Sequence, residues 1–272
     1  MTKTFSLGVI GVGNMGSALV RGIVQAGAVP ADKIIVADAD AARAAALADE
    51  LGSRHAQTNA EAAAESDFVV LVVKPGEVAA PLAEISPVVG GGQTVVSMVT
   101  GVALKRIAQA LGEARPSLIR VMPNTPALVG AGMFAVAAPG VPADRVAALE
   151  RILSAVGEVV QVREELMDAV TGLSGSGPAF VFVFIEALAD GGVAAGLPRA
   201  VAHQLAVQTV AGAARLVQET GQHPGVLKDA VASPGGTTIA GLAELEKGSF
   251  RGLVAAAVRA AAARARELSA GD

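Results

Sequence analysis

The chain has 272 residues, of which 52% are hydrophobic and 17% charged, and its formal net charge is −4. Its longest apolar runs, such as residues 68–73 and 179–185, reach about a third of the ~20 residues that cross a bilayer, which excludes a membrane-spanning protein. The absence of Cys excludes disulfides, thiolate metal sites and thiol nucleophiles, and the mild negative charge without a Lys/Arg cluster argues against nucleic acid as a partner. The first residues run straight into a strand without a signal peptide, so we expect a cytoplasmic protein.

Short runs rich in Val, Ile and Leu alternate with Ala-rich stretches of helical length in the first part of the chain. The apolar runs are typical of strands buried on both faces, and they cover residues 5–10, 33–37, 67–73, 94–98 and 117–122. The helical stretches cover residues 15–26, 40–51, 81–85 and 104–111, and two further strands at 130–137 and 158–162 flank a helix at 143–155. This alternation predicts an α/β domain with a mainly parallel sheet covered by helices.

After residue 166 the strand-like runs stop, and the sequence predicts helices at 178–195, 198–220, 225–232, 239–247 and 252–268. Pro178 and Pro198 fall in predicted first helical turns, where proline is tolerated. The helix over residues 180–194 is apolar nearly all round, so it belongs in the centre of a bundle or against another subunit. We therefore expect an all-helical C-terminal domain at residues 164–272 that contributes to an oligomer.

The first strand leads into a glycine motif, Gly-Val-Gly-Asn-Met-Gly at residues 11–16, which opens a helix. In this GxGxxG pattern Gly11 allows a tight turn, Gly13 lets the backbone approach a pyrophosphate, and Gly16 lets the helix and strand pack closely. The N-terminus of the helix offers free N–H groups and partial positive charge to phosphates. The motif predicts a dinucleotide-binding, Rossmann-like domain at residues 1–163, with cofactor contacts from Gly11, Gly13, Asn14, Met15 and Gly16.

Asp38 follows the second predicted strand, 22 residues after Gly16. An acid there accepts hydrogen bonds from the adenosine 2′-hydroxyl and repels a 2′-phosphate, which favours NADH. Two alternatives stay open: Asp38 and Asp40 are also suited to cap the next helix, and Arg43 is placed to meet a 2′-phosphate.

Four segments together resemble the pyrroline-5-carboxylate reductase family over essentially the whole chain. They are Val-Lys-Pro at 73–75, Val-Met-Pro-Asn-Thr-Pro at 121–126, Thr-Gly-Leu-Ser-Gly-Ser-Gly-Pro-Ala at 171–179, and Ser-Pro-Gly-Gly-Thr-Thr at 233–238 with its flanks from His223. The resemblance implies a Rossmann domain followed by an all-helical dimerisation domain that interlocks with a second subunit, with dimers assembled into a larger ring. It also implies hydride transfer from NADPH or NADH to the C=N bond of 1-pyrroline-5-carboxylate, which gives L-proline in the last step of proline biosynthesis.

The segment at 233–238 is a loop of small residues that feeds a helix beginning near Thr238. Exposed backbone N–H groups at such a junction suit a carboxylate, and Gly235 and Gly236 permit close approach. By resemblance Thr238 hydrogen-bonds the substrate ring nitrogen and is the catalytic residue, although a threonine here is also suited to a helix N-cap. The predicted substrate-binding residues are Ser233, Gly235, Gly236, Thr237, Thr238 and Ser176.

Lys74 and Asn124 follow the carboxyl ends of their predicted strands, the edge where open α/β sheets bind ligands. The resemblance implies that Lys74, Pro75 and Asn124 border the nicotinamide and its ribose, and that Asn59 lies near the adenosine ribose. Lys74 is equally suited to be a solvated lysine at a strand end, and Asn59 to be a helix cap.

Other chemistries fit the sequence less well. The Gly-Leu-Ser-Gly-Ser segment at 172–176 is close to a nucleophile elbow, but Ser176 replaces its second glycine and no strand precedes it, so Ser174 and Ser176 are expected to pack near the active site. His55, His203 and His223 are too scattered for a metal site, and no metal is expected. Two alternatives stay open: another Rossmann-plus-helical dehydrogenase of the β-hydroxyacid type, and a non-catalytic nucleotide-sensing dimer.

Overall fold

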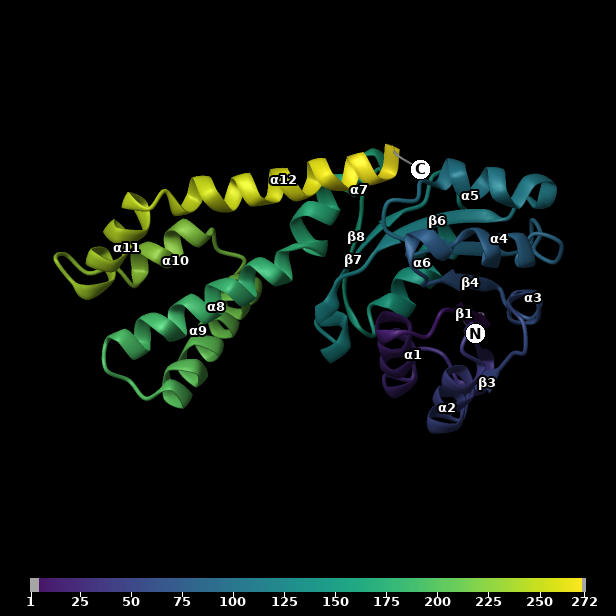
Figure 1. Ribbon diagram of the computed structural model, residues 1–272, viewed down its shortest axis with the longest axis horizontal. Helices are drawn as coiled ribbons and strands as arrows, with labels where there is room; N and C mark the ends of the chain where they lie inside the picture. Colours follow the sequence, from purple (N-terminus) through teal and green to yellow (C-terminus); the bar gives the residue numbers. More distant parts are fainter. Residues whose placement is uncertain (1–4, 271–272) are drawn as a thin grey trace. The chain divides into compact units, whose positions relative to one another are not determined.

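The computed structural model describes residues 5–270 and is shown in Figure 1. Contacts within the chain divide it into two units, one of Met1–Ser176 with Ala260–Asp272 and one of Gly177–Arg259. The expected domain boundary between residues 163 and 164 stays a prediction. The contacts within the chain group residues 164–176 with the unit that contains the sheet.

The first unit is built on a sheet whose strands, among the described residues, lie in the order β3-β2-β1-β4-β5-β6-β7-β8. Neighbouring strands are parallel except β6 and β7, which are antiparallel. The strands are β1 (Leu7–Ile10), β2 (Ile34–Ala37), β3 (Arg54–His55), β4 (Phe68–Leu71), β5 (Thr94–Ser97), β6 (Ser117–Met122), β7 (Gly132–Ala137) and β8 (Gly157–Gln161). The predicted α/β domain with a mainly parallel sheet is confirmed.

The central strands are buried along their whole length, which explains their continuous apolar sequences. Every residue of β1, β2, β4 and β5 is buried. Alternate residues of a strand point to opposite faces, so the sheet has a hydrophobic core on each side. Val9 and Val36 belong to one core, and Ile10 and Ile35 belong to the other.

Helices cover both faces of the sheet (Figure 1). The core with Val9 includes buried residues of α1 (Asn14–Gln25), α2 (Ala41–Leu51) and α6 (Ala143–Leu153), and the core with Ile10 includes those of α3 (Asn59–Ala64), α4 (Ala79–Ile85) and α5 (Leu104–Leu111). Neither α3 nor the short edge strand β3 was predicted from the sequence. Because the strands are parallel, the carboxyl ends of β1, β2 and β4 meet at one edge.

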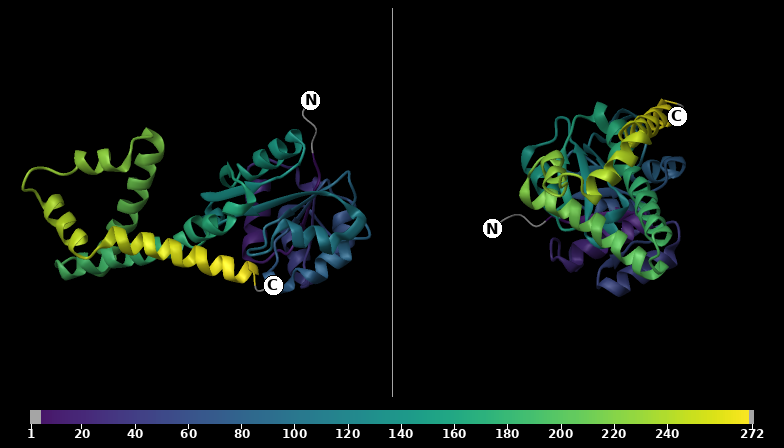
Figure 2. Two further views of the ribbon diagram at one scale, coloured as in Figure 1. Left: turned by 90° about the horizontal axis from the view of Figure 1, so that it is seen from above. Right: turned by 90° about the vertical axis from the view of Figure 1, so that its left-hand side faces the viewer.

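The second unit is entirely helical, as predicted. It contains α8 (Gly177–Ala194), α9 (Arg199–Thr220), α10 (Pro224–Ala230), α11 (Thr237–Lys247) and the first part of α12 (Phe250–Ala270). Figure 2 gives two further views of these helices. Pro178 lies in the first turn of α8, whereas Pro198 is the N-cap of α9 and precedes the helix, so the placement predicted for Pro198 is wrong by one residue.

The helical unit has almost no core of its own. Of its residues, all of which the structure describes, only Ala189, Ala202 and Ala206 are buried. Large apolar side chains of α8 are exposed instead, among them Phe182 and Val183. Burial of apolar surface is the main favourable term in folding, so these side chains need a further partner surface.

A continuous helical stretch, Glu164–Ala194, joins the two units. It contains α7 (Met167–Val170), a π-helical turn at Thr171–Gly175, and α8. By length and composition alone this stretch could cross a membrane. A membrane span was excluded from the sequence because only uninterrupted apolar runs were considered, which are shorter than this helix. An exposed helix of this kind is covered either by lipid or by another subunit.

Candidate active site

The glycine motif forms a turn between β1 and α1 that leaves no room for side chains at two positions. Gly11 has φ +94°, and a methyl group there would lie 2.4 Å from the carbonyl oxygen of Val72. A methyl group at Gly16 would lie 2.0 Å from the carbonyl oxygen of Gly11. These two glycines allow α1 to begin directly against the sheet. At Gly13, in contrast, a methyl group would meet nothing within 4 Å, so this backbone faces open space.

The N-terminus of α1 is open to an anion. Gly13 is the N-cap, and no side chain caps the helix. Asn14 and Met15 are the first helical residues, so their backbone N–H groups have no partner within the helix. The Met15 side chain packs against the hydrophobic core, which leaves its backbone as the part available to a ligand. Free N–H groups and the helix dipole together suit a phosphate.

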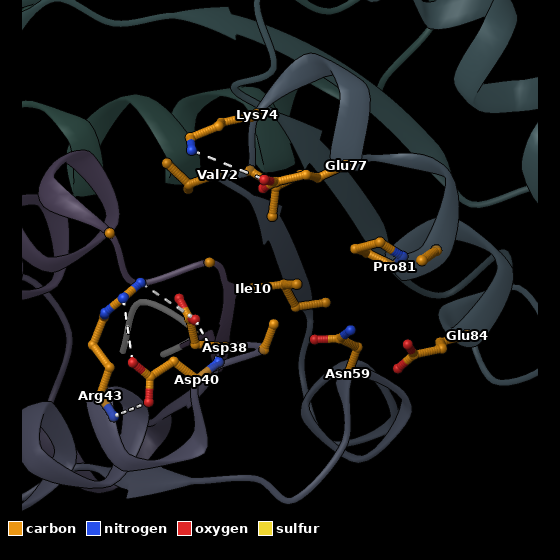
Figure 3. Close-up of a pocket in the computed structure, with 15 residues that line it drawn as sticks. Ile10, Asp38, Asp40, Arg43, Asn59, Val72, Lys74, Glu77, Pro81 and Glu84 are labelled. Atoms are coloured by element: carbon orange, nitrogen blue, oxygen red, sulfur yellow. Dashed lines mark hydrogen bonds and ion pairs between the residues drawn. The ribbon is translucent and has the colours of Figure 1, made fainter.

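A cavity of about 620 Å³ lies at this edge of the sheet. It brings together five of the predicted cofactor residues: Gly11, Gly13, Asp38, Asn59 and Lys74. Figure 3 shows the cavity with Asp38 and Asn59 on one side and Lys74 on another. A volume of this size is within the range of small-molecule sites.

Asp38 is held by backbone N–H groups at the end of β2. Its Oδ2 accepts a hydrogen bond from the Val12 N–H at 2.7 Å, and its Oδ1 accepts one from the Asp40 N–H at 2.9 Å. The side chain is only 10% exposed. Asp40, and not Asp38, is the N-cap of α2, where it accepts a hydrogen bond from the Arg43 N–H at 3.2 Å. The carboxylate of Asp38 therefore connects the glycine turn to the start of α2.

Arg43 lies between the two carboxylates. Its guanidinium is 3.5 Å from Oδ1 of Asp38 and 3.3 Å from Oδ2 of Asp40, and both ion pairs are drawn in Figure 3. All three side chains line the cavity. The part of the cavity lined by Asp38, Asp40 and Arg43 therefore carries two negative charges and one positive charge.

Asn59 begins the helix that follows β3, and Lys74 follows β4. Asn59 is the first residue of α3, but the cap is Thr58, whose hydroxyl accepts the Glu61 N–H at 3.1 Å. The alternative that Asn59 is a helix cap is therefore wrong. Lys74 follows β4, is 84% exposed, and reaches Glu77 at 3.9 Å. This loose ion pair leaves its ammonium group able to meet a ligand.

The remaining predicted residues of the first unit lie outside this cavity. Gly16 packs inside the turn, and Pro75 and Ser176 line a second cavity of about 310 Å³. Asn124 uses its Oδ1 to accept the Met133 N–H at 2.8 Å, which fixes the connection between β6 and β7.

The loop from Ser233 to Thr238 belongs to the second unit. The Gly236 N–H donates to the Ser233 carbonyl at 3.1 Å, and Gly235 has φ +66°. Gly236 is the N-cap of α11, and no side chain caps that helix. The alternative that Thr237 or Thr238 serves as the N-cap is therefore wrong, and the first N–H groups of α11 stay available to an anion.

The sequence analysis missed several polar residues that line the two cavities. Glu77 and Glu84 line the larger cavity, and Thr100, Thr171 and Arg264 line the smaller one. Thr100 follows β5, so the edge rule that selected Lys74 and Asn124 could have found it. Thr171 begins the segment at 171–179 that carries the family resemblance, although no role was predicted for it. Glu77, Glu84 and Arg264 lie on or beside helices, where no sequence pattern marks them. Within residues 5–270, which the structure describes, no cluster of His, Asp or Glu is suited to a metal ion.

Comparison with known proteins places the chain in one family. The family profile for pyrroline-5-carboxylate reductase dimerisation matches residues 164–268, and the profile for NADP oxidoreductase, coenzyme F420-dependent, matches residues 6–101. The pyrroline-5-carboxylate reductase of Synechocystis sp. is 48% identical over 97% of this chain and 98% of its own length.

Two solved structures agree with this result. A pyrroline-5-carboxylate reductase from Coxiella burnetii matches with a TM-score of 0.93 and 36% identity, over 98% of this chain and 99% of that one. Pyrroline carboxylate reductase from Plasmodium falciparum, crystallised with NADP bound, matches with a TM-score of 0.87 and 31% identity, over 99% of this chain and 100% of that one.

The chain forms a homodimer, and the dimerisation profile includes α8, the helix whose large apolar side chains are exposed. The predicted fold, function and enzyme class, an NAD(P)H-dependent pyrroline-5-carboxylate reductase, are confirmed by likeness over nearly the full length of the chain. On this evidence the chain belongs to the pyrroline-5-carboxylate reductase family.

Proposed function

We propose that the chain reduces the C=N bond of 1-pyrroline-5-carboxylate with NADPH or NADH and releases L-proline, the last step of proline biosynthesis. The observation that carries this proposal is identity of 42–48% to pyrroline-5-carboxylate reductases such as those of Escherichia coli and Synechocystis sp. over 97% of this chain. The glycine turn and its cavity support the proposal of a nucleotide site, which such a reaction requires.

The residues around the larger cavity fit a dinucleotide. The open backbone at Gly13 and the uncapped N-terminus of α1 support a pyrophosphate site at Gly11, Gly13, Asn14 and Met15, and Gly16 keeps the helix against the turn. Asp38 and Asn59 are proposed for the adenosine ribose, and Lys74, Pro75 and Asn124 for the nicotinamide half. When bound there, the reduced nicotinamide supplies a hydride ion to the imine carbon.

The loop at the start of α11 is proposed to hold the substrate. The N–H groups of Thr237 and Thr238 suit its carboxylate, and Gly235, where a methyl group would meet nothing within 4 Å, leaves room for it. At Gly236 the space beside the backbone is taken by the Ser233 side chain, so Gly236 is proposed to contribute through its backbone. The Thr238 hydroxyl can accept a hydrogen bond from the iminium N–H and can donate one to the amine that results. Thr238 is therefore proposed as the catalytic residue that orients the ring, with Ser233 and Ser176 as further contacts.

The substrate itself removes the need for a strong general acid. A cyclic imine that enters protonated is already electrophilic at carbon, so hydride addition at that carbon leaves a neutral amine. The chain then has to align two bound molecules and exclude water, and such alignment can supply several kcal/mol of the barrier reduction, on the order of 7–11 kcal/mol in favourable cases.

Two statements about assembly and compartment are part of the proposal. Dimers are proposed to join into a larger ring, as the family resemblance implies, and the enzyme is proposed to work in the cytoplasm. The family membership disfavours both the β-hydroxyacid dehydrogenase and the nucleotide-sensing dimer as alternatives.

The proposal is tested by the absorbance of reduced nicotinamide at 340 nm, with 1-pyrroline-5-carboxylate and either coenzyme. Thr238→Ala should lower kcat/KM by about 10- to 100-fold and leave the Kd for the coenzyme within about twofold, because it removes a hydrogen bond made to the substrate alone. Thr238→Ser keeps the hydroxyl and is the matched control. Equal loss of kcat/KM and coenzyme binding, or no loss, would refute the role of Thr238. Oxidation of 3-hydroxyisobutyrate with NAD(P)+ and no turnover of the imine would refute the proposed reaction.

A further inference from the structure

We infer that Asp38 makes this enzyme select NADH over NADPH, through a carboxylate that the fold holds fixed at the adenosine end of the cavity. The inference rests on the proposed function, because it concerns the coenzyme of that reaction.

The carboxylate of Asp38 cannot turn away from an approaching nucleotide without losing its hydrogen bonds to the backbone. It accepts the Val12 N–H at 2.7 Å and the Asp40 N–H at 2.9 Å, and its side chain is 10% exposed. Val12 lies within the glycine motif itself, between Gly11 and Gly13. Rotation of the Asp38 side chain would therefore leave a backbone donor of the glycine turn unpaired, which is unfavourable in a partly buried position.

The carboxylate lies where a dinucleotide places its adenosine ribose. In sheets of this type the pyrophosphate lies at the start of the first helix, and the ribose lies beside the residue that follows the second strand. Asp38 directly follows β2, and it lines the same cavity as Gly11 and Gly13. A ribose 2′-hydroxyl can donate a hydrogen bond to this carboxylate, whereas a 2′-phosphate brings a second negative group to it.

Arg43 does not offset this repulsion. Its guanidinium is 3.5 Å from Asp38 and 3.3 Å from Asp40, so its single positive charge is already shared between two carboxylates. To bind a 2′-phosphate it would have to give up those ion pairs. The rest of the cavity adds Glu77, Glu84 and Lys74, so negative charge also predominates over the whole lining.

The size of the preference for NADH follows from the Coulomb repulsion between a carboxylate and a phosphate near a protein surface. A carboxylate and a phosphate a few ångströms apart, at an effective dielectric constant of about 20, repel each other by more than the free energy that changes an affinity tenfold. We therefore expect kcat/KM with NADH to exceed that with NADPH by at least about tenfold. The NADP bound to the reductase of Plasmodium falciparum is a property of that protein.

The experiment compares both coenzymes at saturating imine for the wild-type enzyme and for Asp38→Asn. The amide keeps an oxygen that accepts the Val12 N–H, removes the charge, and leaves Arg43 paired with Asp40 alone. We expect the ratio of kcat/KM for NADH to that for NADPH to fall by at least about tenfold, mainly because NADPH improves. The matched control is Asp49→Asn, which removes a charge of the same sign from an exposed position of α2 outside the cavity lining and should change the ratio by less than about threefold. An equal change in the two variants would overturn the assignment to Asp38.

Calorimetric titration of the wild-type enzyme with NAD+ and NADP+ in the absence of imine gives a second readout. We expect NAD+ to bind at least about tenfold more tightly. If neither coenzyme supports imine reduction while NAD+ binds more tightly, the proposed reaction fails and the selectivity stands. If the imine is reduced and NADPH is preferred, the reaction stands and the inference about Asp38 is overturned.

Discussion

Alanine substitutions in the glycine turn should separate its role in folding from its role in binding. At Gly13 a methyl group meets nothing within 4 Å, and φ is −65°, which alanine adopts without strain. Alanine is a poorer N-cap than glycine, but it also lowers the entropy of the unfolded chain, and each effect is about 0.5–1 kcal/mol. We expect Gly13→Ala to change the free energy of unfolding by less than about 1 kcal/mol and Tm by less than about 4 °C.

The matched control, Gly11→Ala, should damage the fold. Gly11 has φ +94°, where an L-residue carries strain of about 1–3 kcal/mol. The added methyl group would also lie 2.4 Å from the Val72 carbonyl oxygen, which is backbone and cannot move aside alone. Together these terms amount to about 3 kcal/mol or more, which lowers Tm by roughly 6–12 °C for a unit of this size.

Gly13→Ala, which should change the stability least, should weaken NADH binding. The methyl group at Gly13 points into the open space that the pyrophosphate is proposed to approach, so Gly13→Ala should raise the Kd for NADH about 10- to 100-fold. The chain lacks Trp and Tyr, so the fluorescence of NADH can be titrated without their emission. Calorimetry gives Tm. If Gly13→Ala bound NADH like the wild type, or lost as much Tm as Gly11→Ala, the glycine motif would serve the fold alone and the proposed pyrophosphate site would be wrong.

Three further outcomes are expected. Arg120, 8% exposed, lies 3.6 Å from Glu164, so Glu164→Ala should lower the free energy of unfolding by about 2–4 kcal/mol, measured by urea denaturation. Hydrogen bonds from Arg21 hold the pKa of Glu50 below its ordinary 4.5, so the ion pair adds stability above that pH. A melting series should therefore show a lower Tm for Glu50→Gln at pH 7 and no difference once Glu50 is protonated. Phe182, 63% exposed on α8, is proposed to face the partner subunit, so Phe182→Glu should yield monomers by light scattering.

Each of these outcomes has a control. Glu165→Ala changes an exposed neighbour of Glu164 and should alter stability by less than about 0.5 kcal/mol, and an equal loss would contradict the role of the buried ion pair. A Tm difference for Glu50→Gln that grew as the pH fell would contradict the sign of its pKa shift. A Phe182→Glu protein that stayed dimeric on dilution would show that this face of α8 is not part of the interface.

The strands were predictable where burial determined the sequence. β1, β2, β4 and β5 are buried on both faces, and each was visible as a compact apolar run. β3 has only Arg54 and His55, both exposed, so it carries no apolar signal and depends on pairing with β2. α3 is six residues long with three consecutive alanines, and only the cap at Thr58 marks it.

The position of the candidate site could be predicted from the sequence, but most contacts between its side chains and the backbone could not. The glycine spacing and the ends of the strands led to Gly11, Gly13, Asp38 and Lys74, which line one cavity. The sequence could not show that Asp38 binds the Val12 N–H, because that contact depends on how β2 meets the glycine turn in space.

The capping alternatives show the same limit of local reasoning. A polar residue before a helix is a cap only if its side chain reaches the helix N–H groups, and that depends on the path of the incoming chain. Asp40 and Thr58 do reach them, whereas Asn59 and Thr238 lie inside their helices and do not. The π-helical turn at Thr171–Gly175 was likewise invisible, because a π-turn has no hydrophobic period of its own.

The central claim is that the loop from Ser233 to Thr238 presents the imine to a nicotinamide bound at the glycine turn. A crystal structure of the dimer with NADH and L-proline tests it most directly. The account predicts proline beside this loop, with its carboxylate on the N–H groups at the start of α11, its nitrogen within hydrogen-bonding distance of Thr238, and its ring facing the nicotinamide. Proline bound elsewhere, or a loop remote from the nicotinamide in every subunit arrangement, would contradict it.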